Sequence, residues 1–129
     1  MFKLPPNIDK SWTLFLDRDG VINKKLEADY VKSWSEFEFI EGVKESIAHF
    51  SKLFGRIVVV TNQQGIGKGL MTEEDLYAIH DKMLNQLKCC DATIHAIMYC
   101  PHLALENCNC RKPNPGMALK AKVLFPEID

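Results

Sequence analysis

A run of β-branched residues, Ile57-Val58-Val59-Val60, places the strongest constraint on the fold of this chain. Such a run is typical of a strand that is buried on both faces. Further strands are predicted at 12–16 and 92–99, and the apolar spacing between the strands is helical. Strands that alternate with helices predict a parallel sheet with right-handed crossovers. The expected class is therefore α/β.

Helices are expected where apolar residues recur at helical spacing and suitable residues stand at the ends: at 41–54, 72–87 and 114–124. Gly55 would stop the first helix, Thr72 with Asp75 resembles a capping box, and Asn114 would be an N-cap before a proline. The stretch 19–40 is aromatic and has no clean period, so we expect a loop or small flap near the first strand. A loop whose rings only pack onto the core is an equally good interpretation.

Two aspartates, Asp17 and Asp19, directly follow the first predicted strand, and Gly20 comes next. Ligands of α/β proteins usually bind at the carboxyl ends of the strands. Because glycine tolerates unusual φ/ψ, a turn at Gly20 would let both carboxylates reach one site. One can then act as nucleophile and the other as acid–base, near a hard cation such as Mg²⁺. Taken alone, an Asp-rich turn without chemistry explains the pattern equally well.

Donors that suit phosphate oxygens are predicted at two places: Thr61, Asn62 and Gln63 after the second strand, and Arg111 and Lys112 before the last helix. If the first two strands are neighbours, Thr61 lies close to the aspartates, where its hydroxyl and nearby N–H groups can bind phosphate. Arginine can grip phosphate with two donors, and lysine can neutralise its charge. In isolation, a strand end and a solvated basic pair are the commoner explanations.

Three cysteines and a histidine gather in one predicted loop: Cys100, His102, Cys108 and Cys110. Three thiolates and an imidazole suit tetrahedral Zn²⁺, and four protein ligands make a closed, structural site. Cysteines packed as small hydrophobes fit less well, because the loop also carries polar residues. Cys89 and Cys90 fall at a helix end and are interpreted as semi-buried thiols without chemistry.

Length and composition predict a single globular domain over 1–129, since 47% of the 129 residues are apolar. The net charge of −1 argues against a broad nucleic-acid-binding surface. No apolar run approaches the roughly 20 residues that span a bilayer, and the start lacks the apolar region of a signal peptide, so a cytoplasmic location is expected. Lys68 is followed by Gly69, which excludes a nucleotide P-loop there.

Taken together, four stretches resemble the haloacid dehalogenase superfamily: Asp17-Arg18-Asp19-Gly20-Val21-Ile22-Asn23, Thr61-Asn62-Gln63, Cys100-Pro101-His102 with Cys108-Asn109-Cys110, and Arg111-Lys112-Pro113. Within it they resemble the subgroup of D-glycero-D-manno-heptose 1,7-bisphosphate phosphatase and the histidinol-phosphate phosphatase domain. The resemblance runs from about Leu14 to the last residue. It implies a Rossmann-like parallel-sheet core with a zinc-binding loop in place of a large cap.

The resemblance also implies a Mg²⁺-dependent hydrolase of a small phosphorylated metabolite. Asp17 would form an aspartyl-phosphate, and Asp19 would protonate the leaving oxygen and then activate water. Thr61 and Lys112 would hold the transferring phosphoryl group, and Arg111 would contact substrate phosphate. Mg²⁺ would be bound by Asp17 and by the backbone carbonyl of Asp19. Phosphoryl transfer depends mainly on such positioning and charge stabilisation.

The resemblance favours heptose 1,7-bisphosphate as substrate, because 114–117 and 29–31 look like the heptose enzyme. The short spacing from His102 to Cys108 is similar to the histidinol enzyme, so histidinol phosphate is the alternative.

Family members continue into another strand that ends in a Gly-Asp-x-x-x-Asp type motif and completes the Mg²⁺ site, whereas this chain stops at Ile128-Asp129. A domain that lacks its last strands would bind Mg²⁺ weakly and would hydrolyse its substrate weakly. A non-catalytic phosphate-binding remnant is therefore a second alternative. Such a domain would also expose the edge of the first strand, so self-association is expected.

Overall fold

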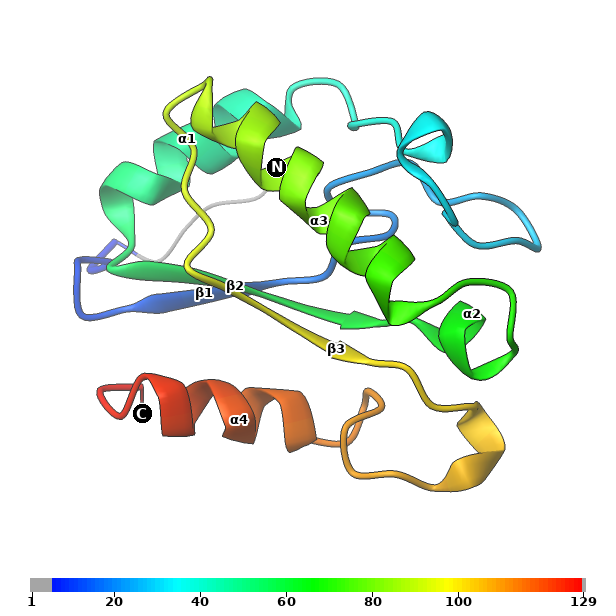
Figure 1. Cartoon of the computed structure of the whole chain (residues 1–129). Coiled ribbons are helices and arrows are strands. Elements are labelled where there is room, and N and C mark those ends of the chain that lie inside the picture. Colours follow the sequence, from blue (N-terminus) through cyan, green and yellow to red (C-terminus); the bar gives the residue numbers. More distant parts are fainter. Residues whose placement is uncertain (1–5, 129) are drawn as a thin grey trace.

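The computed structural model describes residues 6–128 and arranges them in three layers (Figure 1). A parallel sheet lies in the middle, with α1 (Val43–Leu53) and α3 (Glu73–Lys88) on one face and α4 (Gly116–Leu124) on the other. The predicted α/β class and parallel sheet are confirmed. Residues 1–5 and Asp129, which the predicted domain includes, lie outside the described residues.

The sheet contains β1 (Thr13–Leu16), β2 (Arg56–Asn62) and β3 (Ala96–Cys100), in the order β1-β2-β3 within residues 6–128. The central strand β2 pairs in parallel with both neighbours. Its residues Ile57, Val58 and Val59 are fully buried, which confirms the interpretation of the β-branched run. Because the strands are parallel, the carboxyl ends of β1 and β2 lie at the same edge of the sheet.

Strand and helix limits differ from the prediction where local contacts compete with the apolar pattern. Strand β2 extends to Asn62, since the ladder with β3 continues beyond the apolar run. Strand β3 begins at Ala96 rather than 92, because Asp91 has a φ of 59° and the N–H of Ala92 donates to Leu87, which closes the turn after α3. Helix α1 begins at Val43, because Gly42 takes the N-cap position with a φ of 81°.

Helix caps gave one confirmed prediction and one correction. The capping box of α3 is present: Thr72 Oγ1 accepts from the Asp75 N–H, and the Asp75 carboxylate accepts from the Thr72 N–H. Asn114 is not the N-cap of α4, because its Nδ2 donates to the Cys108 carbonyl at 2.9 Å. Pro115 takes the N-cap position instead.

The aromatic stretch 19–40 forms a flap with one short helix, η1 (Trp34–Glu36). Both interpretations of its rings apply to different residues. Trp34 stacks on Phe37 at 4.9 Å between ring centroids, and Phe37 is buried in the core cluster beside α3. Tyr30 instead faces the cavity described below. The polar loop after β2 also contains a short helix that was not predicted, α2 (Gln64–Gly67).

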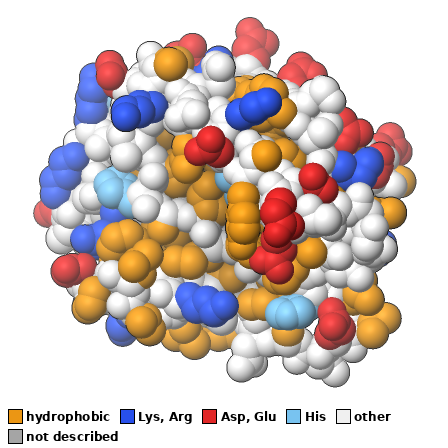
Figure 2. All heavy atoms as spheres, viewed as in Figure 1, with side chains coloured by type: hydrophobic (Ala, Val, Ile, Leu, Met, Phe, Trp, Pro, Cys, Tyr) orange, Lys and Arg blue, Asp and Glu red, His pale blue; other side chains and the backbone are white. Residues whose placement is uncertain are grey.

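Apolar side chains are not confined to the core. Figure 2 shows them gathered over β3 and α4, and the outer surface of α4 exposes Leu119, Val123 and Leu124.

Cys89 and Cys90 are exposed rather than semi-buried, because α3 ends at Lys88 and both thiols lie in the turn after it. None of the helices in residues 6–128 is long and apolar enough to cross a membrane.

Candidate active site

A cavity of about 650 Å³ opens where β1 and β2 end. Its lining includes Asp17 and Asp19 after β1, Asn62 at the end of β2, and Arg111 and Lys112 from the loop before α4. The structure therefore brings together predicted site residues from three separate segments. The parallel register accounts for this, since it places the aspartates beside the polar end of β2.

Asp17 is the more exposed carboxylate, with 43% of its side chain accessible. Its Oδ2 lies 2.9 Å from the Lys112 ammonium, and its Oδ1 accepts from the N–H of Arg18 at 2.7 Å. Lys112 is itself held in place because its Nζ donates to the Val60 carbonyl at 3.0 Å. An accessible carboxylate with a fixed cation beside it suits attack on an anionic phosphoryl group.

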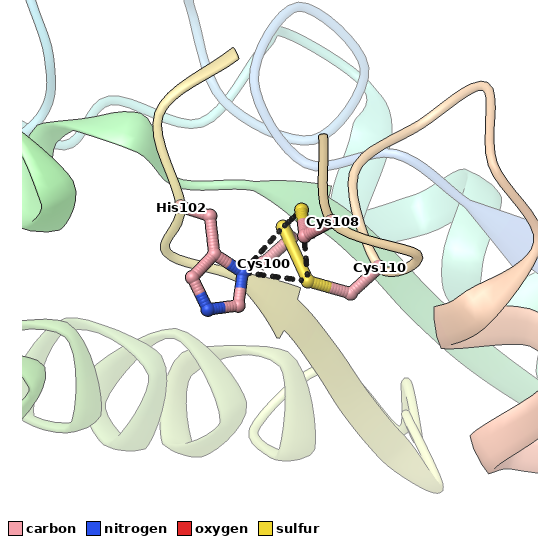
Figure 3. A group of neighbouring side chains, drawn as sticks. All are labelled: Cys100, His102, Cys108 and Cys110. Atoms are coloured by element: carbon pink, nitrogen blue, oxygen red, sulfur yellow. Dashed lines mark hydrogen bonds between the residues drawn. A yellow bond between two sulfur atoms is a disulfide. The ribbon is translucent and has the colours of Figure 1, made fainter. Parts of the chain in front are cut away.

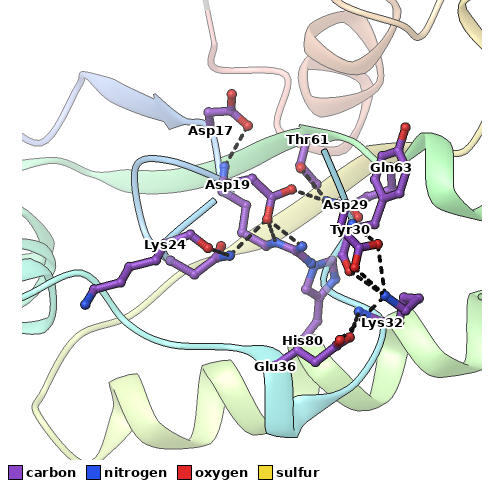
Figure 4. A network of polar contacts seen from close by, with 12 residues as sticks. Asp17, Asp19, Lys24, Asp29, Tyr30, Lys32, Glu36, Thr61, Gln63 and His80 are labelled. Atoms are coloured by element: carbon purple, nitrogen blue, oxygen red, sulfur yellow. Dashed lines mark hydrogen bonds and ion pairs between the residues drawn. The ribbon is translucent and has the colours of Figure 1, made fainter. Parts of the chain in front are cut away.

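Asp19 is held by a network of donors (Figure 4). Its Oδ1 accepts from Arg18 Nη2 at 2.7 Å and from Asn23 Nδ2 at 2.9 Å, while its Oδ2 accepts from Gln63 Nε2 at 3.1 Å. Burial opposes ionisation, but the charge of Arg18 and these hydrogen bonds outweigh it, so the pKa of the Asp19 carboxyl lies below its usual value. The side chain is therefore an ionised, fixed base in this structure.

Arg18 connects this network to α3, and the sequence analysis did not assign it a role. Its side chain is fully buried, and its Nη1 lies 3.1 Å from Nε2 of His80. Because a guanidinium only donates, His80 Nε2 accepts and the imidazole is neutral. Burial and the charge of Arg18 lower the pKa of His80 to about 3. The sequence gives one signal for this contact: His80 stands on the apolar face of the helix predicted at 72–87.

The polar residues at the end of β2 contact other site residues. Thr61 and Gln63 are buried, and Gln63 Nε2 donates to Thr61 Oγ1 at 2.8 Å as well as to Asp19. Asn62 Oδ1 accepts from the backbone N–H of Lys112 at 3.0 Å. Their side-chain amides, which the sequence suggested as phosphate donors, thus position Asp19 and Lys112.

The predicted metal loop brings its four candidate ligands together: Cys100, His102, Cys108 and Cys110 (Figure 3). One ligand atom from each lies within 4.8 Å of all the others. Cys108 Sγ is 3.4 Å from Cys100 Sγ and 3.6 Å from Cys110 Sγ, and His102 Nδ1 is 3.1 Å from Cys110 Sγ. The structure joins Cys100 and Cys110 as a disulfide, which the sequence analysis did not predict.

The separations of Cys108 Sγ from the other two sulfur atoms fit zinc ligands. Sulfur atoms about 2.3 Å from a central Zn²⁺ lie roughly 3.8 Å apart at the corners of a tetrahedron. Three sulfurs and an imidazole nitrogen that approach one another in a single loop are therefore the donor set that structural zinc takes.

Comparison with known proteins gives a consistent result. In curated proteins, the chain is 44% identical over 108 residues to D-glycero-alpha-D-manno-heptose-1,7-bisphosphate 7-phosphatase of Mycobacterium tuberculosis, a match that covers 84% of this chain and 57% of the relative. The chain thus spans little more than half the length of that relative.

Two solved structures share the fold. D,D-heptose 1,7-bisphosphate phosphatase of B. bronchiseptica, solved with magnesium and phosphate, superposes with a TM-score of 0.82 at 37% identity and covers 88% of this chain and 63% of that one. A Mesorhizobium loti protein described as a putative HAD-like (haloacid dehalogenase-like) phosphatase gives a TM-score of 0.73 at 28% identity. That match covers 94% of this chain and 59% of the other. The fold is therefore of the haloacid dehalogenase type. The family model described as "Polynucleotide kinase 3 phosphatase" matches residues 13–126, and the chain belongs to that family.

Proposed function

We propose that this chain is a Mg²⁺-dependent phosphomonoester hydrolase that works through an aspartyl-phosphate, with D-glycero-D-manno-heptose 1,7-bisphosphate as its substrate. The observation that carries the proposal is the exposed Asp17 carboxylate, held 2.9 Å from the Lys112 ammonium at the mouth of the cavity. The names of the relatives support the substrate. We further propose that the whole chain, 1–129, acts as one hydrolase domain.

In the proposed reaction, an Asp17 oxygen attacks phosphorus while the bond to the leaving oxygen breaks. Lys112 balances the charge of the phosphoryl oxygens, Thr61 supports the phosphoryl site from the end of β2, and Arg111 contacts substrate phosphate. The leaving oxygen takes a proton from Asp19. Water then attacks the phosphorus of the aspartyl-phosphate and gives a proton to Asp19. The bond from phosphorus to the Asp17 oxygen breaks, which frees the Asp17 carboxylate and releases inorganic phosphate.

The lowered pKa of Asp19 suits the second half of this cycle, in which it acts as a base. The first half needs a protonated carboxyl. An incoming phosphoryl dianion would supply negative charge beside Asp19 and would raise its pKa, because a nearby like charge disfavours ionisation. Asp19 therefore takes up a proton from solvent when the substrate binds.

Magnesium is part of the proposal, and the residues fit it. Asp17 presents carboxylate oxygens at the cavity, which suit a hard cation. The Asp19 carboxylate is less exposed than that of Asp17 and accepts hydrogen bonds from Arg18, Asn23 and Gln63, so the Asp19 backbone carbonyl is the oxygen that this residue would offer. When bound, the ion supplies positive charge to the phosphoryl oxygens.

We also propose that Cys100, His102, Cys108 and Cys110 hold one structural Zn²⁺, with the two bonded sulfurs as separate thiolates. This needs a reducing compartment, which is consistent with the exposed thiols of Cys89 and Cys90. A cytoplasmic location belongs to the same proposal.

The last part of the proposal is self-association through β1. Within residues 6–128, β1 pairs only with β2, and all four of its residues are partly exposed. An edge with unpaired backbone groups can pair with a second copy.

Phosphate release with Mg²⁺ tests the function. Heptose 1,7-bisphosphate, histidinol phosphate and a 3′-phosphorylated oligonucleotide are assayed in parallel, with Asp17→Asn to remove the nucleophile and Lys120→Gln, on exposed α4, as the control. We expect release from the heptose bisphosphate that disappears only in Asp17→Asn.

The substrate panel separates the alternatives. Preference for histidinol phosphate would replace the proposed substrate, and preference for the oligonucleotide would overturn the small-metabolite class. Absence of release from all substrates, with phosphate binding retained, would identify the non-catalytic phosphate-binding alternative.

A further inference from the structure

Another hollow of the molecule lies between α3 and β3 and has a volume of about 260 Å³. We call it the α3–β3 groove, and it is lined by Tyr77, His80, Asp81, Leu84, Ile97 and Tyr99. None of these residues lines the cavity at Asp17, so the groove is a separate site. Its volume is below that of sites that enclose a whole small molecule, but it can take one side chain.

Strand β3 forms one wall of the groove and has a free edge. Within residues 6–128 it pairs only with β2, and no other backbone hydrogen bond reaches Ile97, Met98 or Tyr99. The outer edge therefore presents N–H and C=O groups that an extended segment can pair with. Segments that bind by strand addition gain affinity from such backbone bonds and specificity from pockets for alternate side chains.

The charge of the groove favours a cationic side chain. Asp81 is exposed, and within residues 6–128 it makes no ion pair. The lining contains no lysine or arginine, and its histidine, His80, is neutral because it accepts from Arg18. A lysine or arginine side chain that entered the groove would thus meet an unmatched carboxylate.

Two tyrosines give the groove a fixed shape at one end. The hydroxyls of Tyr77 and Tyr99 lie 2.7 Å apart, and their rings meet edge to face at 5.9 Å between centroids. The Glu73 carboxylate contacts both hydroxyls. A pocket that is ordered before binding loses less entropy when it is filled. Tyr77 remains 51% exposed, so its ring can also attract a cation.

His80 supplies an unused donor to the groove. Its side chain is more than nine-tenths buried, since the residue is 6% exposed. Because Nε2 accepts from Arg18, Nδ1 carries the proton, and no acceptor for that proton is present within residues 6–128. A buried N–H without an acceptor is costly, which points to an acceptor that arrives with a ligand. A backbone carbonyl of an added strand is such an acceptor.

We propose that the α3–β3 groove binds an extended segment of a partner protein, which adds to the edge of β3 and places a lysine or arginine side chain beside Asp81. The segment supplies backbone partners for β3 and an acceptor for His80. A second copy of the chain fits less well, because its own edge strand, Ala96–Cys100, contains no lysine or arginine. The inference is independent of the proposed function, since binding at the groove needs no hydrolysis.

Fluorescence anisotropy with short labelled peptides tests the groove. The probe is a six-residue peptide that alternates lysine and valine, because valine favours an extended backbone and the lysines then share one face. It is compared with a glutamate–valine peptide and with a lysine–valine peptide methylated on its backbone nitrogens, which cannot donate to a strand. We expect the unmodified lysine–valine peptide to bind at least about tenfold more tightly than either of the others.

A pair of matched variants locates the binding site. Asp81→Asn removes the charge and keeps the shape, and it should weaken binding of the lysine–valine peptide about tenfold, the loss expected for one charged hydrogen bond. Glu45→Gln changes an exposed carboxylate of α1 that makes no ion pair within the described residues, and it should leave binding unchanged. Circular dichroism confirms that both variants are folded.

Several results would overturn the proposal. These are failure of the lysine–valine peptide to bind at about 1 mM, binding that Asp81→Asn leaves unchanged, and equal binding of the methylated peptide. Equal losses in Asp81→Asn and Glu45→Gln would show that the peptide only responds to the overall acidity of the chain. If the peptide dissociates self-associated chains in sedimentation equilibrium, a second copy occupies the groove in place of a partner.

Discussion

His80 and Arg18 are paired in the interior, and neither contacts the cavity. Arg18 spans the distance from His80 to Asp19, with 3.1 Å and 2.7 Å between the bonded atoms. The imidazole accepts one guanidinium N–H, and the carboxylate accepts two others. Arg18 is thus fixed at both ends, and the position of Asp19 depends on a residue of α3.

The lowered pKa of His80 predicts a dependence of stability on pH. Its pKa is about 3 in the folded chain against 6.5 in the unfolded chain, so between these values only the unfolded chain takes up the proton. Stability is therefore lost as the pH falls from 6.5 toward 3. The contribution is about 2 kcal/mol between pH 7 and pH 5.

Urea denaturation at pH 7 and pH 5 measures this effect. His80→Gln keeps a neutral acceptor for Arg18 and should remove that part of the pH dependence. His49→Gln, at an exposed histidine of α1, is the matched control and should keep it. The same dependence in all three chains would contradict the assignment.

At the scale of elements, the short helix α2 lies between the flap and the cysteine loop. Gln64 joins the two, because its amide contacts the Tyr30 hydroxyl on one side and the Ala104 N–H on the other. A Cβ on Gly65 would lie 3.1 Å from Tyr30 Cγ, and one on Gly67 would lie 2.6 Å from the Pro101 carbonyl oxygen. Two glycines thus allow both neighbours to approach.

These distances predict different costs for two similar substitutions. Gly67→Ala meets backbone, which cannot turn aside, so we expect a loss of about 1–3 kcal/mol of stability. Gly65→Ala meets a side chain that has to move only a few tenths of an ångström, and it should cost less. Urea midpoints of both variants test this order, and a larger loss in Gly65→Ala would show that the flap is the more rigid neighbour.

The cysteine loop offers a second test at this scale. Chelation of zinc should lower Tm by at least about 5 °C even with excess Mg²⁺, because a structural site contributes to folding free energy. Metal analysis is expected to find one zinc per chain, which Cys108→Ser loses. Cys89→Ser and Cys90→Ser alter exposed thiols outside the loop and should retain it. A metal-free chain whose Tm responds to a thiol reductant would instead identify a disulfide as the stabilising bond.

For the whole molecule, two surfaces are candidates for the proposed self-association: the outer edge of β1 and the exposed apolar face of α4. We expect the mass in sedimentation equilibrium to rise with concentration. Val123→Lys, at a side chain that is 82% exposed on α4, should leave this rise unchanged if β1 is the contact. Loss of association in Val123→Lys would place the contact on α4, and a monomer at all concentrations would exclude both.

The layers and the location of the site could be predicted because they follow from local pattern and strand direction. Ile57, Val58 and Val59 are buried as their β-branched run predicts, and Asp17 meets the end of β2 because parallel strands share one edge.

Details that depend on competition between distant groups could not be predicted. Asn114 contacts the Cys108 carbonyl instead of capping α4, and Arg18 is satisfied by His80 across 62 residues of sequence. The sequence around Lys68 only excludes a P-loop, because nothing local indicates that this lysine lies over Tyr30.

The hydrogen bonds that set the site also determine when it can form. Gln63 reaches Asp19 across 44 residues, Asn62 reaches Lys112 across 50, and Lys112 reaches Val60 across 52. Closing such long loops costs chain entropy that only a nearly complete fold repays. We therefore expect the arrangement around Asp17 to form late in folding and to be absent from partly folded chains. Catalytic competence would then report complete folding of the chain, which bulk secondary structure does not.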